Sequence, residues 1–198
     1  MLYSSLIINE RYKMKTIMLD QVLSQKELFY MYRQITGSHN WVMNCASGPH
    51  EGFMSGPALI VKDNNGYVNN YPLCLWGQTL VYRIAKILED KKIGIPTELK
   101  RMWFNATYHG KKTQHWLHQD DMVTSHSKTI LLFMTPLWQP DWRGSFFVDG
   151  EEFKFKPGNA VILDSQEFHT GESVESETHN WQRVTCNIII GHADDTRV

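Results

Sequence analysis

The chain is organised around one short stretch, Trp116-Leu117-His118-Gln119-Asp120. Its aromatic and apolar neighbours favour a β-strand, and successive side chains of a strand point to opposite faces. The side chains of His118 and Asp120, two residues apart, are therefore expected on the same face. An imidazole and a carboxylate in this arrangement supply half of a 2-His-1-carboxylate triad, the ligand set that holds iron(II) and leaves coordination positions open.

A second histidine must come from another part of the chain, because one strand presents only two ligands at this spacing. The best placed is His169, which follows the strand-like segment 160–163 and precedes Thr170-Gly171, a strand end that can turn back toward the metal. The other later histidines lie in polar loops or near the chain end: His126, His179 and His192. The sequence thus predicts a metal site made of His118, Asp120 and His169.

Fourteen residues after His169, Arg183 opens another strand-like run, Arg183-Val184-Thr185. A guanidinium presents parallel N–H groups that suit bidentate capture of a carboxylate. We therefore expect Arg183 at the base of the pocket, as the partner of an anionic ligand.

Length and charge limit the classes of protein. The 198 residues are most simply one domain, long enough to bury roughly two-thirds of the unfolded surface. A formal net charge of -1 without a basic stripe argues against nucleic acid as an obligatory partner. The chain has no apolar run long enough for a membrane span and no signal-peptide pattern, so we expect a soluble, cytoplasmic protein. The segment 1–13 is expected to be a loosely attached extension.

Cysteine usage agrees with a reducing compartment. The three cysteines are an odd number without CxxC spacing, which argues against a disulfide framework and against a thiolate zinc cluster. They are expected to be inert thiols: Cys45, Cys74 and Cys186.

Helical periodicity is confined to the first half of the chain. Ser24 and Glu27 form a capping box, and apolar residues at helical spacing then predict a helix that ends at Gly37. A second amphipathic helix is predicted over 80–88. From about residue 99, short β-type runs favour a sandwich, barrel or jelly roll with the helices packed outside. These runs are 101–108, 114–118, 129–135, 145–148, 152–155, 160–163 and 183–190, preceded by a short strand near 58–62.

The order of these parts resembles the Fe(II)- and 2-oxoglutarate-dependent dioxygenases, and among them the prolyl 4-hydroxylase-like group with its small bacterial and phage members. The resemblance covers roughly residues 99–191. It rests on Tyr108, His118-x-Asp120, the run 129–138 with Gly144, Pro157-Gly158, His169 and Arg183. It implies a mainly β fold with flanking helices, the double-stranded β-helix or cupin-like jelly roll. The implied single domain spans 1–198, with 1–98 as helical support and loops and 99–191 as the catalytic core.

The resemblance also implies roles for individual residues. His118, Asp120 and His169 match the iron ligands, and no catalytic residue is expected beyond the iron centre. Arg183 matches the residue that pairs with the C5 carboxylate of 2-oxoglutarate, with Thr185 as a hydroxyl partner and Tyr108 as a hydrogen-bonding tyrosine. The implied cofactors are Fe(II), 2-oxoglutarate and O2, with ascorbate as an accessory reductant.

Three positions bear on how closely the chain follows the family. Phe133 stands where a tyrosine is frequent, which removes one hydroxyl contact to 2-oxoglutarate. Gly144-Ser145 replaces the usual Gly-Gly pair. Asp120 is present, which disfavours the halogenase variant of the family, where this carboxylate is absent.

The implied activity is hydroxylation of an unactivated C–H bond, coupled to decarboxylation of 2-oxoglutarate to succinate and CO2. A peptidyl prolyl or other protein side chain is the first substrate hypothesis, by family analogy, and small molecules stay open. Two other functions stay open as well: a cupin-type metal-dependent hydrolase or isomerase, and a non-catalytic jelly-roll binding module.

Overall fold

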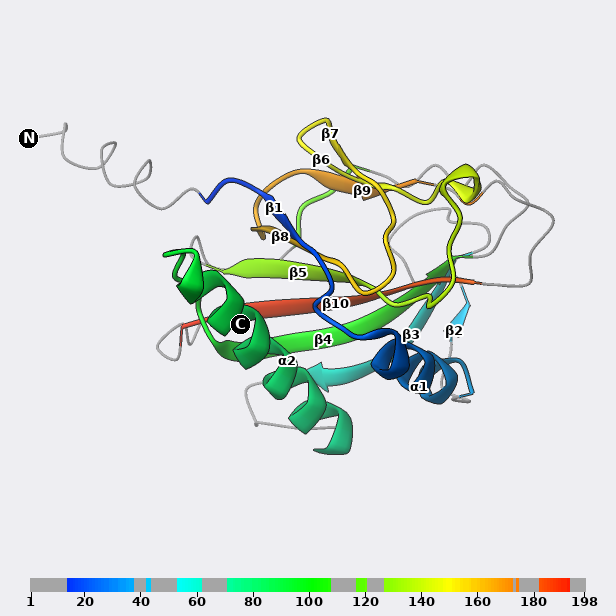
Figure 1. Cartoon of the computed structure of the whole chain (residues 1–198), viewed down its shortest axis with the longest axis horizontal. Coiled ribbons are helices and arrows are strands. Elements are labelled where there is room, and N and C mark those ends of the chain that lie inside the picture. Colours follow the sequence, from blue (N-terminus) through cyan, green and yellow to red (C-terminus); the bar gives the residue numbers. More distant parts are fainter. Residues whose placement is uncertain are drawn as a thin grey trace, which may run out of the picture.

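The computed structural model describes residues 14–37, 42–43, 53–61, 71–107, 117–120, 127–172, 174 and 182–192. Figure 1 shows the helices and strands of this part of the chain. In chain order they are β1 (Ile17–Leu19), α1 (Gln25–Thr36), β2 (Val42–Met43), β3 (Phe53–Val61), α2 (Tyr71–Asp90), β4 (Glu98–Thr107), β5 (Lys128–Phe133), the 3-10 turn η2 (Pro140–Trp142), β6 (Phe146–Val148), β7 (Glu151–Phe153), β8 (Ala160–Asp164), β9 (His169–Gly171) and β10 (Arg183–Gly191).

The described strands form two antiparallel sheets. The large sheet has the order β1-β8-β5-β10-β4-β3-β2, and the small sheet has the order β7-β6-β9. One buried apolar cluster joins β5 and β8 of the large sheet to β6 and β7 of the small one. A second cluster joins the opposite face of the large sheet to α1 and α2. This layered arrangement, with the helices outside, is the one that the strand pattern predicts (Figure 1).

The inner face of the large sheet, the face toward the small sheet, follows from strand alternation. Leu131 and Phe133 of β5 belong to the apolar cluster between the sheets. Residues directly opposite one another on paired strands lie on the same face. The register therefore adds polar residues of the two neighbouring strands to this inner face: Arg183, Thr185 and Asn187 of β10, and Asn105 and Thr107 of β4.

The sheet includes more of the N-terminal half than the sequence pattern predicts. β1 pairs with β8, and β3 pairs with β4, so that segments expected to be helical support and loops extend the large sheet at both edges. β1 and β2 are too short to show a period of two, which is why the pattern misses them. The strand expected near 58–62 is part of the longer β3.

One expectation near the metal ligands also needs correction. Residues 114–116 of the strand predicted over 114–118 lie outside the described residues, and His118 at its end forms an isolated bridge with His169. His169 does not end the strand at 160–163; it begins β9, in the other sheet. A turn between β8 and β9 carries the chain from one sheet to the other, and three residues are too few for a periodic signal.

Cys186 is a buried free thiol in β10, and burial raises its pKa well above the usual value. A thiol that stays protonated is unreactive, which confirms the expectation for this cysteine. The side chains of Cys45 and Cys74 lie outside the described part of the structure. No helix in the described ranges is both long enough and apolar enough to cross a membrane.

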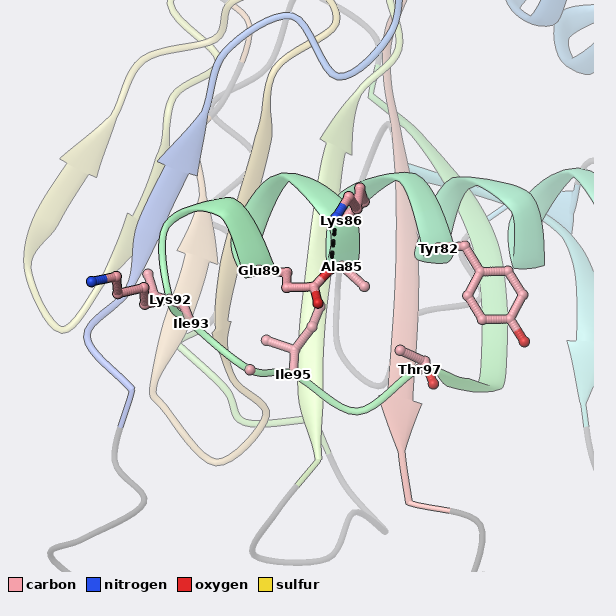
Figure 2. Close-up of a pocket in the computed structure, with 9 residues that line it drawn as sticks. Tyr82, Ala85, Lys86, Glu89, Lys92, Ile93, Ile95 and Thr97 are labelled. Atoms are coloured by element: carbon pink, nitrogen blue, oxygen red, sulfur yellow. Dashed lines mark hydrogen bonds and ion pairs between the residues drawn. The ribbon is translucent and has the colours of Figure 1, made fainter.

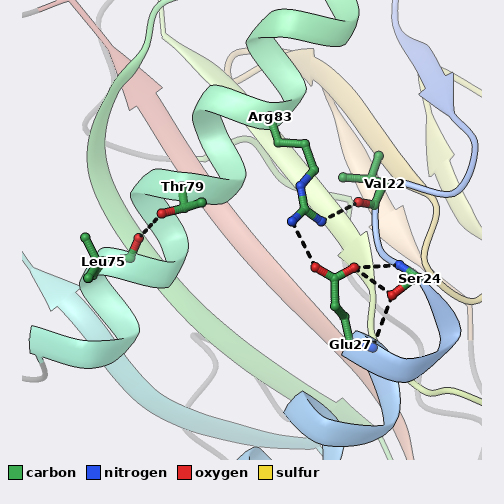
Figure 3. A network of polar contacts seen from close by, with 6 residues as sticks. All are labelled: Val22, Ser24, Glu27, Leu75, Thr79 and Arg83. Carbon is green, nitrogen blue, oxygen red and sulfur yellow. Dashed lines mark hydrogen bonds and ion pairs between the residues drawn. The ribbon is translucent and has the colours of Figure 1, made fainter.

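The predicted capping box at the start of α1 is confirmed, and it connects α1 to α2 (Figure 3). Glu27 Oε2 accepts hydrogen bonds from Ser24 N at 2.9 Å and Ser24 Oγ at 2.8 Å, while Glu27 Oε1 lies 2.8 Å from Arg83 Nη2. Arg83 also donates to the carbonyl of Val22 at 3.0 Å. The hydrogen bond from Arg83 is the largest of the influences that lower the pKa of Glu27 to about 2.

This network predicts a pH-dependent contribution to stability. Because the folded pKa of Glu27 lies below its unfolded value, the contribution is present above about pH 4.5 and is lost as the pH falls toward 2. Both side chains are more than a third exposed, so Glu27→Gln should cost about 1 kcal/mol or less at pH 7. Denaturant unfolding across this pH range measures the difference. Glu89→Gln, which breaks an exposed pair with Lys86, is the control and should leave the unfolding curve unchanged.

Candidate active site

The three predicted metal ligands converge at one end of the space between the sheets. One ligand atom from each of His118, Asp120 and His169 lies within 4.8 Å of the others. His169 Nε2 is 3.8 Å from Asp120 Oδ1, and the two imidazole rings meet edge to face with centroids 4.4 Å apart. A single ion with bonds of about 2 Å holds its ligands at similar separations. Two imidazoles and one carboxylate are the donor set of a facial triad, so these residues fit iron(II).

Backbone pairing brings the ligands together from distant parts of the sequence. His118 N donates to His169 O at 3.0 Å, and His169 N donates to His118 O at 2.8 Å. Two residues that exchange both hydrogen bonds point their side chains to the same face. Asp120 is fixed separately, because its N–H donates to the carbonyl of Ser165 at 3.1 Å.

Side-chain hydrogen bonds orient two of the ligands. His169 Nδ1 lies 2.9 Å from the carbonyl of Glu167. A carbonyl only accepts, so Nδ1 carries the proton and Nε2 presents its lone pair to the metal position. The Thr129 hydroxyl donates to Asp120 Oδ2 and also contacts Ser165 Oγ at 2.9 Å. This leaves Asp120 Oδ1 directed toward His169.

The environment of His169 favours its neutral form. The side chain is buried, and burial is the largest influence that lowers its pKa. The carboxylate of Asp120 raises this pKa, while His118 lowers it, and the net direction is downward. Only a neutral imidazole binds a metal ion, so this shift favours coordination.

Arg183 is buried on the inner face of the large sheet at the start of β10. Its Nε donates to the carbonyl of Gly144 at 2.7 Å, whereas Nη2 is buried with no hydrogen-bond partner in the part of the chain that the structure describes. Burial lowers its pKa to about 10, and Glu172 acts in the opposite direction, so Arg183 is a cation at neutral pH. A buried cationic donor without a partner is costly unless a ligand supplies an acceptor. The observation fits a bound carboxylate.

Small and aromatic residues shape the surroundings of this guanidinium. Gly144 has φ +80°, and an added Cβ there would lie 3.0 Å from Arg183 Cδ. The ring of Phe155 lies 5.8 Å from Arg183 Cζ and packs against Phe133 and Trp138. Aromatic rings and a glycine therefore surround the charged group of Arg183 on this side.

The remaining predicted contacts are partly placed. Thr185 is buried two residues after Arg183 on the same face of β10. Tyr108 lies outside the described residues. Its neighbour Thr107 is buried and pairs directly with Arg183, and its hydroxyl has no hydrogen-bond partner within the described ranges. No sequence motif singles out Thr107, and its direct pairing with Arg183 identifies it once the register is known.

A separate surface pocket of about 410 Å³ lies between α2 and the segment that follows it (Figure 2). α2 packs against the face of the large sheet that is opposite to the inner face. The pocket therefore makes no contribution to the candidate active site. Its lining residues are Tyr82, Ala85, Lys86, Glu89, Lys92, Ile93, Gly94, Ile95 and Thr97.

No protein-family model matches the chain, and no curated protein matches it by sequence. Similarity is found only with solved structures, at low sequence identity.

Three of the solved structures that resemble this chain serve as examples. The non-heme α-ketoglutarate-dependent carbocyclase SnoK from nogalamycin biosynthesis has a TM-score of 0.65 at 11% identity, over 98% of this chain and 85% of that one. A 2OG-Fe(II) oxygenase-family oxidoreductase from Burkholderia pseudomallei has a TM-score of 0.64 at 14% identity, over 92% and 89%. A prolyl-4-hydroxylase from Pseudomonas putida has a TM-score of 0.58 at 14% identity, over 89% and 92%. The chain therefore has the double-stranded β-helix fold of the Fe(II)- and 2-oxoglutarate-dependent oxygenases.

Proposed function

We propose that the chain is an Fe(II)- and 2-oxoglutarate-dependent dioxygenase that hydroxylates an unactivated C–H bond. The observation that carries this proposal is one pair of features from the two sheets: the convergent triad, and the buried Arg183 with a donor that has no partner among the described residues. A metal-dependent hydrolase needs the first feature but has no use for the second.

Each residue has a specific part in the proposed reaction. His118, Asp120 and His169 hold the iron, and when bound, iron with O2 and 2-oxoglutarate supplies the oxidising chemistry that yields succinate and CO2. The carbonyl of Glu167 and the hydroxyl of Thr129 keep two ligands oriented. Arg183 binds the C5 carboxylate, and Thr185 and Tyr108 are proposed as further contacts to the cosubstrate. The apolar cluster between the sheets excludes water from the reaction.

For the primary substrate, we propose a peptidyl prolyl or other protein side chain, and a small molecule as the alternative. The similarity to a prolyl-4-hydroxylase supports the first, and the similarity to a carbocyclase of nogalamycin biosynthesis supports the second. The near-neutral formal charge supports a reaction without nucleic acid, and we propose that it takes place in the cytoplasm.

The first test is anaerobic titration of the iron(II)-loaded protein with 2-oxoglutarate. We expect a weak visible charge-transfer band in the wild type, because chelation of the metal by the cosubstrate places a keto acid next to a reduced iron. His169→Ala should abolish the band by removing a ligand. A folded, iron-loaded wild type without the band would contradict the proposed function.

A second prediction concerns the hydrogen bond that orients Asp120. Thr129→Val keeps the side-chain volume and removes the donor, so iron(II) affinity should fall roughly 10- to 100-fold. Thr135→Val is the matched control, since the buried Thr135 hydroxyl bonds only to the backbone at Gln182 and Val184. Competition with a metal-sensitive dye measures both affinities. Equal losses of affinity in the two variants would mean that Thr129 acts only through general stability.

A third prediction separates the oxygenase from a hydrolase, an isomerase or a binding module. Arg183→Met removes the buried cation and keeps an unbranched side chain, so 2-oxoglutarate should bind about 100-fold more weakly while the metal is retained. Arg83→Met is the control, because Arg83 lies on α2 and bonds Glu27 outside the site. Calorimetry on metal-loaded protein provides the measurement. Undiminished binding of 2-oxoglutarate to Arg183→Met would favour the other functions.

A further inference from the structure

Asn187 is a buried amide in the middle of β10 whose role is not explained by the fold. Only 6% of the residue is exposed, and Nδ2 has no hydrogen-bond partner among the described residues. Leaving a buried donor unsatisfied costs roughly 1 to 3 kcal/mol. Because native structures contain few such groups, each one calls for a specific explanation.

The neighbours of Asn187 on the inner face offer its amide little to bind. It pairs directly with Leu131 on one side and with Trp103 on the other. An aliphatic side chain accepts no hydrogen bond, and an indole N–H only donates. Among the described residues, neither of the side chains directly opposite Asn187 on the inner face therefore offers an acceptor for Nδ2.

The register places Asn187 toward the metal end of this space. Arg183 lies four residues earlier on the same face, a separation of roughly 13 Å along an extended strand. The next inner residue after Asn187 is Ile189, which pairs with Thr129, and Thr129 bonds the metal ligand Asp120. Asn187 thus lies between the buried cation and the triad.

We infer that Asn187 is a second anchor for the cosubstrate, with its Nδ2–H donating to the carboxylate at the end of 2-oxoglutarate opposite to the one held by Arg183. The inference rests on the proposed function. A dicarboxylate has acceptors at both ends, so one molecule satisfies both unpartnered donors on this face of β10, Arg183 Nη2 and Asn187 Nδ2. A ligand with a single acceptor satisfies only one of them.

Asn159 provides a matched comparison. It is also buried, at 3% exposure, but its amide is satisfied within the protein. Its Nδ2 donates to Asp20 Oδ1 at 2.6 Å, and its Oδ1 accepts from Gln21 N at 3.0 Å. Replacing Asn159 removes hydrogen bonds within the protein. Replacing Asn187 removes a donor that makes no hydrogen bond to any described residue.

The experiment compares wild type with Asn187→Leu and Asn159→Leu, each with Ni(II) as a redox-inactive metal. Calorimetry measures 2-oxoglutarate binding, and thermal unfolding of the metal-free proteins measures stability. For Asn187→Leu we expect binding weaker by roughly 10- to 100-fold, with an unfolding temperature equal to or above that of the wild type. For Asn159→Leu we expect the reverse: a lower unfolding temperature, and affinity within about twofold of the wild type.

Asn187→Asp tests the same contact with no change in volume. It replaces the donor by an acceptor, so a carboxylate would face the carboxylate of the cosubstrate and binding should be weaker still. If Asn187→Leu does not fold, the affinity of Asn187→Asp for 2-oxoglutarate tests the inference instead.

The other outcomes are distinguishable. Wild-type affinity in the Asn187 variants would overturn the inference and leave the proposed function intact. A drop in the unfolding temperature of Asn187→Leu as large as that of Asn159→Leu would also overturn it, because the amide would then have a partner inside the protein. If the nickel-loaded wild type binds no 2-oxoglutarate, the proposed function fails, and the inference fails with it.

Discussion

The candidate site depends on the backbone pairing between His118 and His169. These residues are far apart in sequence, and the two hydrogen bonds between them hold their side chains on one face. The same turn that ends in His169 also fixes the third ligand, since its carbonyl groups accept from Asp120 N, from the side chain of Gln119 and from His169 Nδ1. One short connection between the two sheets therefore positions the whole triad. A rigid sandwich on both sides of this connection keeps the ligands in place before a metal arrives.

The inner face of β10 shows the cost of such a site. A strand buried on both faces is expected to be apolar throughout, yet β10 places Arg183, Thr185 and Asn187 between the sheets. Two of these side chains, Arg183 and Asn187, contain donors that no described residue satisfies. A purely apolar replacement would avoid this desolvation cost, so the polar residues are best explained by a ligand. Polar residues in a strand that is buried on both faces are therefore expected to serve the function of the protein.

The sequence supports the parts of the fold that have a strong period or a specific pattern. The capping box at Ser24 and the long strand β4 are observed as the sequence predicts. The short strands β1 and β9 are not predicted, because three residues are too few to show the period of two that marks a strand. No role for Asn187 or Thr107 is predicted from the sequence, for another reason. A lone polar residue in a strand identifies no site until the register shows which face it occupies and which residue lies opposite.

Phe133, which stands where the resemblance implies a tyrosine, has a physical consequence for the proposed binding of the cosubstrate. Phe133 is fully buried, and its ring packs 4.6 Å from that of Phe155, which in turn flanks Arg183. β5 therefore contributes packing at this position and no hydroxyl. The hydroxyls near Arg183 on the inner face belong to Thr107 of β4 and Thr185 of β10. In the proposed oxygenase, the polar contacts to the cosubstrate thus come from β4 and β10 and not from β5. Asn187 lies on β10 and pairs with Trp103 of β4.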